Sequence, residues 1–192
     1  MRLPVPFWSV GDVNVSNLAK VISNIDEKKW IEWNLRQTKF DVHKKTNSIP
    51  FIWNKWDPQY RLLDLEYMNQ DTQLWELLKP FLRKLINKYD GSVVNCLFAR
   101  LPSGAEIKPH KDISLNLLLV HRIHLAVITS PTVKFFIDNK PYEFPAGRIF
   151  ELSNDRLHAV KNNGDDHRVH LIVDILPNYF RSFLKMNNNN LN

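Results

Sequence analysis

The segment that follows Gly91 consists of short apolar or alternating runs separated by turn residues, and this pattern constrains the fold more than any other feature of the chain. Runs of this length with alternating side chains are typical of β-strands. About seven of them follow one another in about 85 residues: VVNCLFARL, RIHLAVIT, VKFFID, YEF, RIFEL, HAVKN and HRVHLIVDIL. Many short strands at this spacing predict an antiparallel sandwich or a jelly roll.

Two connections in this segment carry turn chemistry. The pair Asp138-Asn139 in IDNKPYEF predicts a hairpin, because Asp and Asn accept the backbone conformations that tight turns need. Pro145 and Gly147 in FPAGRIF predict a second turn.

The first 90 residues show helical rather than strand spacing. Between residues 16 and 37 the apolar positions recur mostly at helical intervals, which predicts one or two short helices with Ser16 and Asp26 as N-caps. A helix of this kind buries one face, so it needs a sheet or another helix to cover.

A longer helix is predicted in DTQLWELLKPFLRKLINKYDG. Asp71 is expected to cap its start and Gly91 to end it, while Pro80 is expected to kink or split it. The leucines and aromatic residues of this segment form one apolar stripe, which indicates packing against the core and no direct role in chemistry.

Length and composition fit one compact domain. The chain has 192 residues, of which 44% are hydrophobic, and no internal repeat or Gly/Ser-rich linker divides it. We expect a single domain over residues 1–192, with a mostly helical part over 1–90 that packs on a β-core over 91–178. The asparagine-rich end, 186–192, is expected to be a disordered tail.

The basic balance of the chain does not require an anionic partner. The net charge is +6, but the basic residues are scattered, and the strand half has no basic and aromatic cluster of the kind that stacks bases. We therefore expect no nucleic-acid partner, and the sequence gives no oligomeric state.

The start has two prolines and no uninterrupted apolar stretch, so neither a secretion signal nor a membrane span is expected. The single cysteine, Cys96, cannot form an internal disulfide, and together these features predict a soluble cytoplasmic protein.

A candidate metal site begins with His110 and Asp112 in RLPSGAEIKPHKD. On an extended chain these two side chains project to the same side, while Lys111 points away. The pair alone is weak, because a turn histidine and a capping aspartate give the same short pattern. His158 begins the later run HAVKN, and an antiparallel jelly roll can bring such a strand back beside the earlier one. Two histidines and one carboxylate are the ligand set of non-haem Fe(II) oxygenases.

Arg168 is the candidate partner for a cosubstrate of that iron. A 2-oxoglutarate molecule would chelate Fe(II) through its 1-carboxylate and 2-oxo group, and its distal carboxylate would then need a fixed cation. In HRVHLIVDIL the alternation puts Arg168 and His170 on one face of a strand and Val169 and Leu171 on the other. A guanidinium can pair with a carboxylate through two hydrogen bonds. The alternative is an arginine on the solvated face of an edge strand.

Several blocks of the chain also carry a resemblance. They are LPSGAEIKPHKD, RIHLAV and GRIFELSNDRLHAVKNNGDDHRVHLIVDIL, with FDVHKKTNSIPF before them. In this order and at this spacing they resemble the aspartyl/asparaginyl β-hydroxylase family of Fe(II)/2-oxoglutarate-dependent oxygenases, over residues from about 40 to 178. The resemblance implies a mainly β protein with flanking helices and a double-stranded β-helix core, the jelly roll shared with cupins. It also implies that Fe(II), 2-oxoglutarate and O₂ are used to hydroxylate an unactivated C–H bond.

The resemblance implies roles for particular residues. The family's metal histidines fall on His110 and His158, its cosubstrate arginine on Arg168, and its R-x-H pair on Arg122 and His124. In relatives this pair lies close to the cosubstrate and to the acidic group of the substrate; without the resemblance, a solvated strand face explains the pair as well. The expected metal ligands are thus His110, Asp112 and His158, the expected cosubstrate contacts are Arg168, Arg122 and His124, and no catalytic side chain is assigned beyond the metal centre.

Two positions depart from the family pattern. The animal protein that gives the family its name has glycine where this chain has Asp112, so the full ligand set here looks like the bacterial branch that includes proline hydroxylases. A hydroxyl residue that helps to hold the distal carboxylate is replaced near Ala99, so Arg168 is expected to have a different helper. Whether His43 or His170 contacts the substrate stays open.

These features predict an Fe(II)- and 2-oxoglutarate-dependent dioxygenase that hydroxylates an amino acid or an amino-acid side chain, as aspartyl, asparaginyl and prolyl hydroxylases do. The alternative is a cupin-like module that binds a metal or a small ligand without turnover, because fold alone does not fix function. Arg168 distinguishes the two, since a binding module needs no cation at the far end of a chelating diacid. A free amino acid, a side chain of an intracellular protein and another small metabolite all stay open as the substrate.

Overall fold

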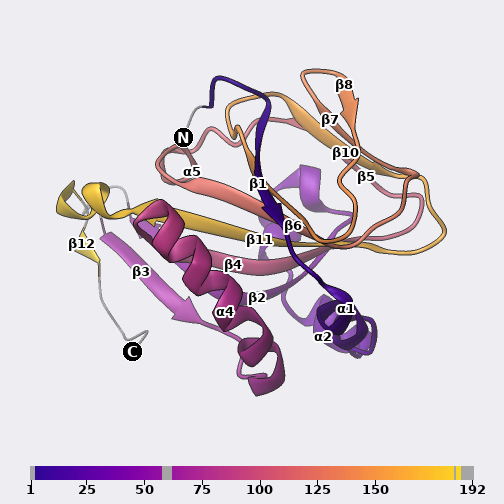
Figure 1. Ribbon diagram of the computed structural model, residues 1–192, viewed down its shortest axis with the longest axis horizontal. Coiled ribbons are helices and arrows are strands. Elements are labelled where there is room, and N and C mark those ends of the chain that lie inside the picture. Colours follow the sequence, from indigo (N-terminus) through magenta and orange to yellow (C-terminus); the bar gives the residue numbers. More distant parts are fainter. Residues whose placement is uncertain (1–2, 58–61, 184, 187–192) are drawn as a thin grey trace.

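The computed structural model of the chain describes residues 3–57, 62–183 and 185–186, and two β-sheets dominate it (Figure 1). The larger sheet has eight strands in the order β1-β9-β6-β11-β4-β2-β3-β12. Neighbours in it are antiparallel except β12 and β3, which are parallel. The strands are β1 (Phe7–Asp12), β9 (Arg148–Leu152), β6 (His121–Ile128), β11 (Arg168–Pro177), β4 (Gly91–Leu101), β2 (Asn47–Asp57), β3 (Leu62–Tyr67) and β12 (Lys185–Met186).

The smaller sheet packs over one face of the larger one. It consists of β5 (Glu106–His110), β10 (His158–Asn162), β7 (Val133–Ile137) and β8 (Lys140–Tyr142), in that order. A cluster of buried apolar residues that includes Leu101, Ala126, Phe135 and Phe150 fills the space between the two sheets. Two antiparallel sheets around one core, with strands that alternate between them along the chain, form the predicted jelly roll.

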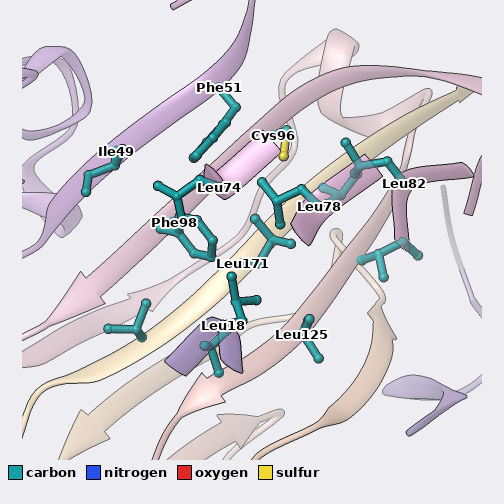
Figure 2. Packing of buried hydrophobic residues seen from close by; sticks show 14 of the residues in the cluster. Leu18, Ile49, Phe51, Leu74, Leu78, Leu82, Cys96, Phe98, Leu125 and Leu171 are labelled. Atoms are coloured by element: carbon teal, nitrogen blue, oxygen red, sulfur yellow. The ribbon is translucent and has the colours of Figure 1, made fainter. Parts of the chain in front are cut away.

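The helices α1 (Ser16–Ser23) and α4 (Thr72–Tyr89) cover the opposite face of the larger sheet. In Figure 1 they lie below β4 and β11, while the smaller sheet lies above these strands. Figure 2 shows leucines of both helices directed at sheet residues such as Phe98 and Leu171. This second core buries the apolar stripe of each helix, as the sequence predicts. The other short helical elements are α2 (Glu27–Glu32), α3 (Leu35–Lys39), η1 (Asp41–His43), α5 (Leu115–Leu118) and η2 (Asn178–Phe183).

The helix ends agree only in part with the predictions. The side chains of Asp26 and Asp71 cap α2 and α4 as expected, by accepting hydrogen bonds from backbone amides two and three residues later. Ser16 is not a cap: α1 starts at Ser16 itself and its N-cap is Val15, which has no side chain able to accept. Pro80 does not split α4, which is one helix from Thr72 to Tyr89.

Gly91 does not provide the left-handed end of α4 that its position suggests. Asp90 does, with φ 42°, and Gly91 is the first residue of β4. A side chain at Gly91 is excluded for another reason, because a Cβ there would lie 2.6 Å from the carbonyl oxygen of Leu176 and 2.6 Å from Cγ2 of Ile175. The glycine therefore permits the close approach of β4 to the end of β11.

The first 90 residues contain more strand than the sequence predicts. Besides the helices, β1, β2 and β3 all belong to the larger sheet, and β2 lies between β4 and β3. The run SIPFIWNKW was not recognised as a strand because it does not alternate: residues 48–52 are all buried. Pro50, which would argue against a central strand, sits where the pairing of β2 with β4 shifts register, and such a bulge tolerates a missing amide.

Smaller differences concern the second half. β5 was not predicted, and the short strand after the hairpin is KPY rather than YEF. The hairpin itself is confirmed: Asp138 and Asn139 both have positive φ, and Ile137 pairs with Lys140. Of the predicted tail, Met186 pairs with Leu63 in β12, and residues 187–192 lie outside the described residues.

Candidate active site

The pairing of β5 with β10 brings the predicted metal ligands together. His110 is the last residue of β5, His158 is the first of β10, and the two are direct partners in the register of this antiparallel pair. Asp112 follows β5 by two residues, and its backbone N–H donates to the carbonyl of Asn154, 2.9 Å away. One ligand atom from each of His110, Asp112 and His158 lies within 4.8 Å of the other two. The three side chains thus converge at one end of the jelly roll.

The two histidine rings are oriented as metal ligands require. Nδ1 of His110 lies 2.8 Å from the carbonyl oxygen of Lys108, and Nδ1 of His158 lies 2.9 Å from that of Arg156. A carbonyl only accepts, so each Nδ1 donates its hydrogen and each Nε2 keeps a lone pair. These Nε2 atoms lie 3.9 Å and 3.8 Å from the carboxylate of Asp112. Burial lowers the pKa of His158, which favours the neutral ring that binds metals.

A buried chain of polar side chains stands behind Asp112. Arg122 of β6 donates to Asp112 and, through Nε and Nη2, to both oxygens of Asp174 on β11, at 2.8 and 2.9 Å. Asn95 of β4 donates to the same Asp174 carboxylate at 2.8 Å. Burial alone would raise the pKa of Asp112, but attraction to Arg122 and to the nearby histidines holds it well below its usual value. The carboxylate is therefore ionised and fixed in place.

Arg122 is held by carboxylates of the chain itself, Asp112 and Asp174. Its closeness to cosubstrate and substrate, which the family resemblance implies, stays a prediction. Asp174 was missed in the sequence, although the alternation in HRVHLIVDIL places it on the same face as Arg168 and His170. The signal was available, but nothing in the spacing shows that β6 pairs with β11 so that Arg122 lies opposite Asp174.

Arg168 and His124 line a cavity between the two sheets, next to the three candidate ligands. The exposed fraction of Arg168 is only 2% and that of His124 is 5%. Among the described residues, neither Nε nor Nη2 of Arg168 has a hydrogen-bond partner, and neither ring nitrogen of His124 has one. Burial lowers the pKa of Arg168 to about 9, so the guanidinium is still cationic at neutral pH. These orphaned donors fit the distal carboxylate of a diacid.

The position of Ala99 shows which groups could replace the missing hydroxyl helper. Ala99 of β4 pairs with Ser48 of β2 on one side and with His170 of β11 on the other, so all three point into the same space. Both polar side chains are buried, at 0% and 2% exposed. In the part of the chain that the structure describes, Nδ1 of His170 has no partner. His170 thus faces inward beside Arg168, as the alternation predicts.

An open groove of about 700 Å³ leads from the surface to the candidate ligands. His43 of η1 lies on it, and its ring meets that of His110 edge to face with centroids 5.6 Å apart. Burial, reinforced by the neighbouring Arg36, lowers the pKa of His43 to about 2, so this ring is neutral. His43 therefore belongs to the wall of the groove, a role that the sequence left open.

Comparison with known proteins identifies the family. The family model described as "Aspartyl/Asparaginyl beta-hydroxylase" matches residues 18–177, which is most of the chain. The protein belongs to the aspartyl/asparaginyl β-hydroxylase family. Membership confirms the resemblance of the sequence blocks and extends it toward the N-terminus, over α1, α2 and α3. No curated protein matches the sequence of this family member.

Solved structures share the fold of this aspartyl/asparaginyl β-hydroxylase family member. An oxidoreductase of the 2OG-Fe(II) oxygenase family from Burkholderia pseudomallei is 12% identical with a TM-score of 0.53; the match covers 68% of this chain and 66% of that one, just under two thirds of its length. A prolyl-4-hydroxylase from Pseudomonas putida is 16% identical with a TM-score of 0.50, and the match covers 91% and 94%. At these identities the likeness concerns the fold alone. None of the described helices is long and apolar enough to cross a membrane.

Proposed function

We propose that the protein is an Fe(II)- and 2-oxoglutarate-dependent dioxygenase that hydroxylates an amino acid or an amino-acid side chain. Membership of the family supports a hydroxylase-like activity in general. The observation that carries the specific proposal is the meeting of three ligand atoms from His110, Asp112 and His158 beside a buried Arg168, whose Nε and Nη2 have no hydrogen-bond partner among the described residues. Such a ligand set on one side of an ion leaves positions open for a chelating cosubstrate.

The residues present fit Fe(II). Two imidazoles with free Nε2 atoms and one ionised carboxylate are suitable donors for Fe(II). When bound, Fe(II) with 2-oxoglutarate and O₂ would supply the oxidising chemistry that couples decarboxylation of the cosubstrate to hydroxylation of the substrate. In this proposal the chain itself orients the participants: Arg122 holds Asp112, and two backbone carbonyls hold the histidine rings.

Arg168 has the cosubstrate role in the proposal. Its guanidinium would pair with the distal carboxylate of 2-oxoglutarate, with His124 and His170 as neutral neighbours. Burial lowers the pKa of both histidines well below the usual value, so neither competes with Arg168 as a cation. A buried cation without a partner is costly, and an incoming carboxylate offsets that cost. The alternative function, a non-catalytic cupin-like binding module, gives no reason for such a cation.

Succinate release tests the proposal. The purified protein with Fe(II), ascorbate, O₂ and 2-oxoglutarate is expected to form succinate slowly, and faster when an amino-acid or peptide panel includes its substrate. Arg168→Ala is expected to keep metal binding and to raise the 2-oxoglutarate concentration needed at least tenfold, and Arg168→Lys to recover part of the loss because a point charge lacks the second hydrogen bond. Wild-type kinetics in Arg168→Ala would contradict the cosubstrate assignment.

A protein that never formed succinate across the panel would favour the binding module instead. The panel should include free amino acids, peptides that carry protein side chains, and other small metabolites. A cytoplasmic location stays a prediction; the buried free thiol of Cys96 is consistent with a reducing compartment.

A further inference from the structure

Arg36 is a second buried cation for which the described part of the chain offers no carboxylate partner, and it lines both the inner cavity and the groove. It comes from α3, and its exposed fraction is 8%. Nη1 donates to Oγ of Ser48 at 3.3 Å, and Nη2 donates to Nε2 of His43 at 3.1 Å. Within residues 3–57, 62–183 and 185–186, Arg36 forms no ion pair with a carboxylate. It lines both the cavity that contains Arg168 and the groove, whereas Arg168 lines the cavity alone.

The charges at the site leave room for one more anion. Burial lowers the pKa of Arg36 only to about 10, so this side chain is cationic at neutral pH. Of the buried arginines that line the site, Arg100 is paired with Glu27. The other three, Arg36, Arg122 and Arg168, face the two carboxylates of Asp112 and Asp174, which leaves one positive charge among the buried groups. The two positive charges of Fe(II) and the two negative charges of 2-oxoglutarate cancel. The loaded site would therefore keep one uncompensated cation in a partly dry space, and a single carboxylate would neutralise it.

Arg36 is better placed than Arg122 to take that carboxylate. Arg122 already donates to Asp112 and twice to Asp174. Arg36 donates two hydrogen bonds, both to neutral acceptors. Hydrogen bonds from its guanidinium to a charged carboxylate would be stronger than these. It is also one side chain away from the metal candidates, because His43 lies between it and His110. An anion on Arg36 would thus hold the rest of a substrate close to the reacting position.

The groove beyond Arg36 is apolar and has a cationic rim. Phe40, Trp53 and Ile172 are among its apolar wall, and Lys39 and Lys111 are on its rim. Asp112 and Asp174 are its only acidic lining residues within the described chain, and both already pair with Arg122. Apolar walls with a few charged groups are typical of small-molecule sites. This groove favours an anion attached to an apolar body.

From this arrangement we infer that Arg36, in place of Arg122, binds the carboxylate of the substrate, and that the substrate is a carboxylic acid whose apolar body lies along the wall at Phe40, Trp53 and Ile172. The inference rests on the proposed function and adds a substrate class and a specificity-determining residue to it. It also separates two carboxylate sites: Arg168 serves the cosubstrate and Arg36 serves the substrate.

Calorimetric titration of the protein loaded with Mn(II) and 2-oxoglutarate tests the inference without turnover. The probes are matched pairs of an acid and its amide, with propyl, 3-phenylpropyl and 3-indolylpropyl bodies. Wild-type protein is expected to bind the aromatic acids about tenfold or more tightly than their amides, as a charge-assisted hydrogen-bonded pair predicts. Arg36→Gln is expected to remove this preference while changing the affinity for 2-oxoglutarate less than about twofold. Arg36→Lys is expected to keep part of the preference.

Two controls make the outcomes distinct. Lys28→Gln removes an exposed positive charge on α2 and is expected to leave the preference unchanged. Arg168→Gln is expected to weaken 2-oxoglutarate binding. Loss of 2-oxoglutarate affinity in Arg36→Gln would overturn the inference, since Arg36 would then serve the cosubstrate. Equal affinity for acid and amide in the wild type, or no binding of either, would also overturn it. If wild type failed to bind 2-oxoglutarate, the proposed function would fall and this inference with it.

Discussion

Each candidate metal ligand is oriented by a second polar group behind it. The histidines rest on backbone carbonyls, which no substitution removes, whereas Asp112 depends on the side chain of Arg122. Arg122 in turn depends on Asp174, which is fully buried and also accepts from Asn95. The geometry at Asp112 therefore rests on residues of three neighbouring strands.

The ligand assignment predicts the metal content of three variants. His110→Ala and His158→Ala are expected to lose Mn(II) binding, and Asp112→Ala to weaken it about 100-fold or more, because each removes one of three donors. Titration of Mn(II) followed by electron paramagnetic resonance measures this. His167→Ala, which removes an exposed histidine, is the matched control and is expected to bind as wild type does. An unchanged metal content in His158→Ala would contradict the site.

Asp174→Ala tests the support behind Asp112. Loss of this carboxylate leaves Arg122 buried with two unpaired donors, which is expected to cost about 3–5 kcal/mol of unfolding free energy. Metal affinity is expected to fall about 10- to 100-fold, because the orientation of Asp112 loosens. Urea unfolding and Mn(II) titration measure the two effects. Asp165→Ala, at an exposed position, is expected to change neither, and equal behaviour of the two variants would argue against a supporting role.

The sequence predicts the ligands better than their support. His110 and Asp112 are two positions apart, and the family blocks add His158, so pattern and resemblance together are sufficient to predict the cluster that the structure brings together, while its role as a metal site stays a prediction. Asp174, the partner of Arg122, is 52 positions away. The two residues meet because they are opposite each other in the register of β6 and β11, which the sequence does not reveal. Arg36 carries no motif at all; only its burial and its lack of a carboxylate partner, as far as the structure describes the chain, make it notable.

At the scale of elements, the long helix and the strands around it show what pattern reading detects. The stripe of α4 has period 3.6 and an aspartate cap, so the helix and its buried face are predictable. β2 is not, because a strand that is buried on both faces loses the alternation on which recognition depends. β1 pairs with β9, which is far away in the sequence, and no local signal specifies such a pairing. β3 pairs with the strand directly before it, β2, so it was missed together with β2.

The junction of α4 and β4 carries a prediction at this scale. Gly91→Ala is expected to destabilise the protein by about 1–3 kcal/mol, since the new methyl group would meet the Leu176 backbone and force β4 away from β11. Thermal or urea unfolding measures the change. Asn87→Ala, at an exposed position of the preceding turn, is expected to shift stability by less than about 0.5 kcal/mol. An unchanged free energy of unfolding in Gly91→Ala would show that the ends of β4 and β11 can separate without cost.

At the scale of the whole molecule, two cores share one sheet. The core under the helices is apolar throughout, whereas the one between the sheets has its polar end at Arg168, His124 and His170. Filling that end with a ligand should stabilise the entire domain, because only the folded chain assembles the site.

Ligand binding should therefore raise the melting temperature. At about 100 times their dissociation constants, Mn(II) and then 2-oxoglutarate are each expected to add about 2.7 kcal/mol, or roughly 5–10 °C, to a domain of this size. Scanning calorimetry of the protein with each ligand, and after removal of metal by a chelator, measures this. His158→Ala is expected to show no shift with either ligand, and a shift from 2-oxoglutarate alone in that variant would place the cosubstrate away from the metal.

Strand β11 has a consequence for which substitutions the protein can accept. All ten of its residues are buried: Val169, Leu171, Val173 and Ile175 face the core under the helices, while Arg168, Ile172 and Asp174 line the cavity or the groove of the candidate site and His170 lies on their side of the strand. Most strands of an antiparallel protein offer every second position to mutation, because one side meets water. In β11 a substitution at a core-facing position is expected to destabilise the fold, and a substitution at a site-facing position is expected to impair the proposed activity. Under selection for activity this strand should drift more slowly than any solvent-facing strand of the sheet, and a saturation mutagenesis screen should find it intolerant from end to end.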